Sequence, residues 1–209
     1  DETAPVAVAA DASGRFAAVA ERGGMVRCWS VDGAREVWRW QGPESPTALA
    51  VADGMAAPRG ERVHKLAFSP DGGRLFAGGT GHHGRLIDVA SGSVLAELQH
   101  LDAAPRAGLC GTFSPGGDWL ATWGSDDLRV RAWDARTGRP LGRDTELPHG
   151  PHWLAVAADG TLTAAWCVDR RIRMVSTGER SEAALPVPTA LAAAALGFSR
   201  SGEHLLVAE

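Results

Sequence analysis

The sequence of 209 residues predicts an all-β chain, a β-propeller of four-stranded antiparallel blades. Two observations lead to this fold class. A Gly-containing turn recurs along the chain, with glycines separated by 58, 45, 43 and 42 residues, and a propeller blade occupies about 40–45 residues. Short apolar runs flank each turn, as in β-hairpins. The aligned glycines are Gly14, Gly72, Gly117, Gly160 and Gly202.

The turn motif is clearest in the segments Leu66–Leu75 (LAFSPDGGRL) and Gly111–Leu120 (GTFSPGGDWL). Proline favours the second position of a tight turn, and glycine can supply a positive φ. The first and second strands of each blade are therefore predicted to flank this turn. Weaker copies occur at Val8–Phe16, Val156–Leu162 and Leu196–Leu205.

A third strand is expected after each hairpin, at Met25–Val31, Gly84–Val89, Leu128–Asp134 and Arg171–Ser176. Residues Arg129 to Trp133 alternate polar and apolar side chains, as a half-buried strand does. A turn with glycine follows, at Gly33, Gly92, Gly138 and Gly178. The fourth strand is clearest at Glu36–Trp40 and Ser93–Leu98. Each repeat thus contains the four strands of one blade.

This pattern predicts four complete blades, half of a fifth blade and an incomplete ring. The expected blades span about residues 4–41, 62–99, 106–147, 151–187 and, in part, 190–209. An insertion loop is expected at 42–62, where the composition is rich in Pro, Gly, Ala and Ser. Such a loop can bind partners, but a tolerated surface insertion is the favoured interpretation.

Composition excludes several classes of protein. The net charge is −4, which opposes nucleic-acid binding, and the longest apolar run, Ala190–Leu196, is too short to cross a membrane. Three cysteines without a CxxC spacing form neither a disulfide framework nor a zinc site, and no cofactor is expected. The cysteines are interpreted as core residues in a reducing, cytoplasmic compartment. Twenty Arg, one Lys and no Asn or Tyr indicate GC-rich coding DNA, which favours a bacterial source.

The segments Phe68–Gly72, Phe113–Gly117 and Asp127–Asp134 resemble the WD-repeat (WD40) β-propeller family, and the resemblance covers essentially the whole chain. The third repeat matches the structural tetrad of the family at His100, Thr122, Asp127 and Trp133. The resemblance implies a buried chain of hydrogen bonds there, which is favoured over a catalytic use of His100 and Asp127. The other repeats depart from the tetrad and are expected to depend on apolar packing.

Propellers contain 4–8 blades, and seven blades would need roughly 300 residues. We therefore expect this chain to be a fragment of a longer propeller chain; closure of the ring by a second chain is the alternative.

Two groups of residues are candidates for partner binding. His82 and His83 lie in a Gly-rich segment, and an exposed loop is favoured there over a metal site, because adjacent strand residues point to opposite faces. Five arginines could form a basic surface for an acidic partner or for phosphates, although a solvated strand edge is the favoured interpretation. These arginines are Arg129, Arg131, Arg170, Arg171 and Arg173.

The predicted function is a scaffold or regulatory domain that binds other proteins and has no catalysis of its own. Bacterial relatives of this family often lie beside a kinase or protease domain, so the resemblance implies a possible fusion to a signalling domain. The alternative is a propeller enzyme or small-ligand binder with its site at the mouth of the central channel, which would need convergent polar groups.

Overall fold

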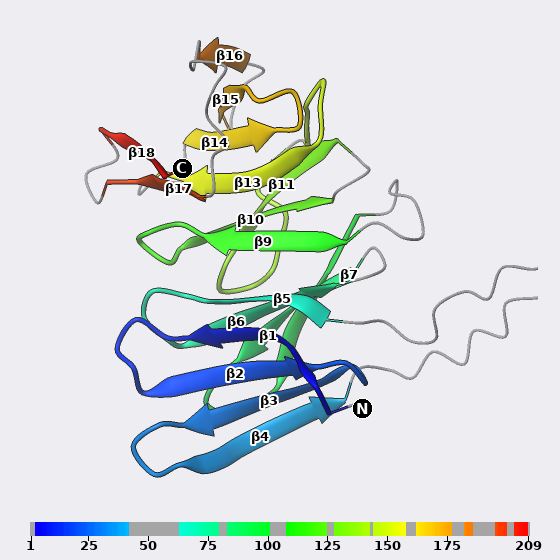
Figure 1. Cartoon of the computed structure of the whole chain (residues 1–209), viewed down its shortest axis with the longest axis vertical. Helices are drawn as coiled ribbons and strands as arrows, with labels where there is room; N and C mark the ends of the chain where they lie inside the picture. Colours follow the sequence, from blue (N-terminus) through cyan, green and yellow to red (C-terminus); the bar gives the residue numbers. More distant parts are fainter. Residues whose placement is uncertain are drawn as a thin grey trace, which may run out of the picture.

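The computed structural model describes residues 3–41, 63–79, 83–100, 108–124, 128–142, 144–157, 162–176, 182–185, 195–199 and 203–208. Every regular element in these ranges is a β-strand, and the strands form four four-stranded antiparallel sheets and one two-stranded sheet (Figure 1). This confirms the predicted all-β fold of propeller-type blades, and the sheets do not close into a ring. The predicted insertion loop 42–62 lies outside the described residues.

Each sheet is formed by strands that follow one another along the chain. Blade one contains β1 (Pro5–Ala10), β2 (Phe16–Glu21), β3 (Met25–Ser30) and β4 (Arg35–Gln41). Blade two contains β5 (Val63–Phe68), β6 (Arg74–Gly79), β7 (His83–Asp88) and β8 (Val94–Gln99). Blade three contains β9 (Leu109–Phe113), β10 (Trp119–Gly124), β11 (Arg129–Asp134) and the short β12 (Thr145–Glu146).

Blade four contains β13 (Pro151–Val156), β14 (Leu162–Cys167), β15 (Ile172–Ser176) and β16 (Glu182–Leu185), and a fifth unit consists of β17 (Ala195–Phe198) and β18 (Leu205–Ala208). The first strands of neighbouring blades contact one another, so the blades are stacked side by side along these inner strands (Figure 1). Within the described part of the chain, no helix is long and apolar enough to span a membrane.

The blades share one strand register. Leu75 pairs with Ile87 in blade two, and Leu120 pairs with Trp133 in blade three. The same positions hold Ala17 opposite Trp29 in blade one and Thr163 opposite Val175 in blade four. Residues of different blades can therefore be compared position by position.

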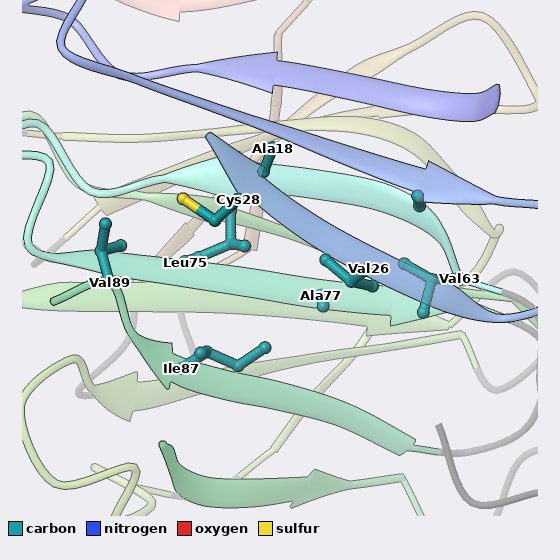
Figure 2. Close-up of a cluster of buried hydrophobic side chains, with 9 residues drawn as sticks. Ala18, Val26, Cys28, Val63, Leu75, Ala77, Ile87 and Val89 are labelled. Atoms are coloured by element: carbon teal, nitrogen blue, oxygen red, sulfur yellow. The ribbon is translucent and has the colours of Figure 1, made fainter. Parts of the chain in front are cut away.

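The apolar core lies between blades, because neighbouring sheets pack face to face. Figure 2 shows the cluster between blades one and two, where Val26 and Cys28 of β3 lie against Leu75 and Ile87. Similar clusters join blade two to three, three to four, and four to the final hairpin. The period-two patterns of the sequence direct these side chains to the faces of the sheets, and stacking of the blades removes them from water.

A polar side chain supports the turn between the first two strands. Ser69 Oγ accepts a hydrogen bond from the amide of Arg74 at 2.9 Å, and Ser114 Oγ accepts one from Trp119 at 3.2 Å. Asp11 makes the equivalent contact with the amide of Phe16 at 2.6 Å. Asp11, Ser69 and Ser114 are all buried. The serine of the repeated motif therefore satisfies a backbone donor that the turn leaves unpaired.

Candidate functional site

Three residues of the predicted tetrad lie together in the buried interior of blade three. Thr122 Oγ1 is 2.8 Å from His100 Nε2 and accepts a hydrogen bond from the Trp133 indole N–H at 2.7 Å. His100 and Thr122 are fully buried, and Trp133 is 7% exposed. Asp127, the fourth residue, lies outside the described residues.

This arrangement links three side chains through one hydroxyl group. Thr122 Oγ1 accepts the indole proton of Trp133, and the same hydroxyl shares a hydrogen bond with His100 Nε2. Groups that are buried and bonded to each other in this way hold strands together and are out of reach of a substrate.

An arginine occupies the same position in the third strand of all four sheets, two residues before the aligned Trp, Ile or Val. These residues are Arg27, Arg85, Arg131 and Arg173. Each makes at least one ion pair with a carboxylate, for example Arg131 Nε with Asp144 Oδ2 at 2.7 Å. The repeat was visible in the sequence as an Arg at a fixed distance from the aligned position, but the sequence analysis did not identify it.

The five arginines of the predicted basic surface therefore occupy different environments. Arg131 and Arg173 are 8% and 4% exposed and paired with aspartates, and Arg129 is half-buried. Arg170 and Arg171 are exposed. The structure does not bring the five guanidinium groups together on one accessible surface.

The predicted histidine pair is only partly described. His82 lies outside the described residues, and His83 is half-buried at the start of β7. Its Nδ1 atom is buried and has no hydrogen-bond partner among the residues that the structure describes. Within the same residues, no three His, Cys, Asp or Glu side chains are grouped closely enough to hold a metal ion.

Blade four has a polar pair that replaces the tetrad. Asp169, at the position of Asp127, accepts two hydrogen bonds from the Arg173 guanidinium, at 2.9 and 2.7 Å, and lies 3.6 Å from His149 Nε2. These hydrogen bonds lower the pKa of Asp169 to about 2. Apolar clusters flank this blade as expected, and the ion pair adds a polar contact that was not predicted.

The turn that follows Asp169 has an unusual backbone. Arg170 has φ +62°, in the left-handed region that disfavours side chains with a Cβ. The same position holds Gly24 (φ +84°) in blade one and Leu128 (φ +55°) in blade three. Arg170 is an exposed residue that retains a strained conformation where another blade has glycine.

The inner strands enclose a pocket of about 490 Å³. Its walls come from the first strands of all five units and include Val8, Lys65, Cys110, His152 and Trp153. The Lys65 ammonium lies 5.3 Å from the centroid of the Trp153 ring. Burial raises the pKa of the Cys110 thiol, and the nearby Lys65 charge acts in the opposite direction. A ligand site at the mouth of the central channel was the alternative drawn from the sequence, but its residues were not predicted, although Lys65 is the only lysine of the chain.

Comparison with known proteins gives matches to one class. Residues 99–134 match the family model described as "WD domain, G-beta repeat". The chain is similar to the WD40 repeat protein poxJ of the fungus Penicillium oxalicum, with 39% identity over 82 residues, and the same protein from another strain matches equally. The match covers 38% of this chain and spans only 23% of that relative's length. These findings support the resemblance to WD40 repeats, which generally serve as protein-interaction scaffolds.

Proposed function

We propose that this chain is a protein-interaction scaffold, acting as a regulatory WD40-repeat domain of a larger protein. The observation that supports this proposal best is the turn of Arg170 and Arg171. Both side chains are exposed, and neither guanidinium makes an ion pair within the described residues. Exposed, unpaired arginines on a rigid sheet are frequent anchors of protein interfaces.

The backbone of this turn supports the same function. A residue with a Cβ at positive φ costs roughly 1–2 kcal/mol, and blade one avoids that cost with Gly24. Strain of this kind is concentrated at functional sites, where the surrounding structure holds the residue in place. The neighbouring Asp169 is occupied by Arg173 and does not neutralise the two exposed charges. The partner surface is therefore proposed to be acidic.

The experiment compares two charge-reversal variants with matched exposure. R170E/R171E changes the proposed surface, and R136E/R139E changes two exposed arginines beyond the opposite end of a third strand. Tagged chains are used to capture partners from cells of the source organism, and each purified partner is then titrated by calorimetry. We expect a partner that binds wild type and R136E/R139E equally and binds R170E/R171E at least about tenfold more weakly.

Equal affinity of R170E/R171E and wild type for every partner would remove this turn from the interface. Affinity that does not fall between about 50 and 300 mM salt would contradict an acidic partner surface, since the contact is electrostatic.

The pocket on the inner strands supports a second function, the binding of a small ligand. Its volume of about 490 Å³ lies within the range of ligand sites in proteins, about 300–1,000 Å³. Its walls combine apolar side chains such as Val8 and Trp153 with the polar groups of Lys65 and His152.

A further inference from the structure

The pocket on the inner strands has a charge that differs from that of the whole chain. The chain carries a net charge of −4. Among the described residues, those that line the pocket include Lys65 and His152 but no Asp or Glu. An anion entering the pocket therefore meets a positive charge without a competing carboxylate on the wall.

Lys65 differs from the arginines of the third strands, because it makes no ion pair with a carboxylate among the residues that the structure describes. Each of those arginines is paired with a carboxylate. Lys65 is exposed, and its ammonium group lies over the face of the Trp153 ring. A cation held over an aromatic ring keeps its charge available to a ligand on the opposite side.

Part of the pocket wall is apolar and exposed to solvent. Val6, Val8 and Trp153 are 37%, 68% and 41% exposed, and all three line this pocket. Large apolar side chains that are grouped and exposed indicate a surface that another molecule covers. The ligand should therefore have an apolar body in addition to its charge.

We propose that the inner pocket binds a small organic carboxylate with an aromatic or branched apolar body. The carboxylate pairs with Lys65, and the apolar body lies against Trp153 and Val8. A single lysine suits a monoanion, whereas phosphate sites usually provide several donors or a fork of arginine N–H groups. A cationic ligand is disfavoured because Lys65 already occupies a face of Trp153. This inference rests on the second proposed function, ligand binding.

The test uses two probes of nearly equal shape, 3-phenylpropionate and its neutral amide, 3-phenylpropanamide. Dissociation constants are measured by ligand-observed NMR at pH 7 and low salt. We expect wild type to bind the carboxylate about threefold more tightly than the amide, the size of effect typical of an exposed ion pair. K65M removes the charge but keeps the aliphatic stem, so it should abolish this preference and leave the amide affinity unchanged. K65R keeps the charge and should retain the preference.

Two further variants locate the binding. W153L should weaken both probes, because Trp153 contacts the apolar body, and R136Q should change neither, because Arg136 is an exposed cation outside the pocket. Circular dichroism confirms that each variant is folded. Equal binding of the two probes by wild type, or a preference that K65M retains, overturns the carboxylate assignment and leaves ligand binding intact. Failure of both probes to bind, or binding that W153L does not alter, overturns the pocket as a ligand site.

Discussion

At the scale of single residues, the most informative feature is the pair formed by Asp169 and Arg173. The Arg173 side chain is 5% exposed and that of Asp169 is 20% exposed. A bidentate arginine–carboxylate contact is among the strongest charge-assisted hydrogen bonds in proteins. Because both charges are largely removed from water, each depends on the other, and the pair should dominate the response of blade four to acid.

The first prediction concerns the pH dependence of this pair. The pKa of Asp169 is about 2 in the folded protein, below its ordinary value of 3.8. A depressed pKa adds stability that is present above the ordinary value and is lost as the pH falls towards 2. We expect this carboxylate to account for a loss of about 2 kcal/mol in the free energy of unfolding between pH 5 and pH 2. Urea unfolding of wild type and D169N at a series of pH values measures the difference.

The control for this prediction is the double variant. At neutral pH, D169N removes the carboxylate that pairs with the buried Arg173 charge and should cost about 3 kcal/mol. R173M/D169N removes that charge and should recover most of the loss. If D169N lost as much stability at low pH as wild type, groups other than Asp169 would control the acid sensitivity.

At the scale of elements, the turn after the third strand is held by the Asp that follows the aligned Trp or Ile. Asp134 Oδ1 accepts hydrogen bonds from the amide and the hydroxyl of Thr137, both at 2.8 Å. Asp88 does the same with Ser91. These hydrogen bonds lower the pKa of both aspartates. Both turns then place a glycine at positive φ, Gly92 at +72° and Gly138 at +66°.

Blade one breaks this pattern and provides the second prediction. Its aligned residue is Ala34, with φ +44°, whereas the neighbouring Gly33 does not have a positive φ. A34G removes the strain and should raise the free energy of unfolding by about 0.5–1 kcal/mol. G33A should be neutral or slightly stabilising, because an added Cβ would meet only Arg35 Cβ at 3.9 Å. Thermal unfolding measures the stability of both variants. Destabilisation by G33A together with no gain from A34G would show that Gly33 occupies the left-handed position.

At the scale of the whole molecule, stability arises between blades. Val89 and Ala135, at one position in blades two and three, are at most 1% exposed because the preceding blade covers them. The equivalent Val31 of blade one is 52% exposed. The difference lies in the neighbouring sheet, since all three are small apolar residues. In such a stack, each blade contributes chiefly to the interfaces with its two neighbours.

Phe76 provides a test of an interface in the third prediction. Its ring is fully buried between blades two and three, and a Cβ added at Gly111 would lie 2.7 Å from its Cε1 atom. G111A should therefore lower the free energy of unfolding by about 1–3 kcal/mol through overpacking. In an F76L background, the same substitution should cost less, because the shorter side chain leaves space.

The matched control for this interface is G108A, where nothing lies within 4 Å of an added Cβ. Chemical denaturation of all the variants yields the coupling free energy between positions 76 and 111. Additive effects of G111A and F76L would mean that the ring does not confine Gly111.

Local sequence was enough to predict the all-β class, the hairpins and the four-stranded blades. These features depend on local interactions: short-range hydrogen bonds form the Ser-Pro-Asp-Gly turns, and alternating apolar and polar side chains form the strands. The resemblance to the repeat family also identified His100, Thr122 and Trp133, whose side chains are joined by hydrogen bonds in the structure. A strand pattern does not show which other surface of the protein packs against each face of the strand.

That surface is decided by the packing of blades. Arg131 and Arg171 look alike in the sequence, yet Arg131 is buried, paired with Asp144 and bonded to the Gln99 carbonyl of blade two, whereas Arg171 is exposed. Lys65 and Trp153 are far apart in the chain and meet only because the first strands of successive blades line the same pocket. Burial and charge pairing depend on the whole stack, so the candidate binding sites emerge only in the tertiary structure.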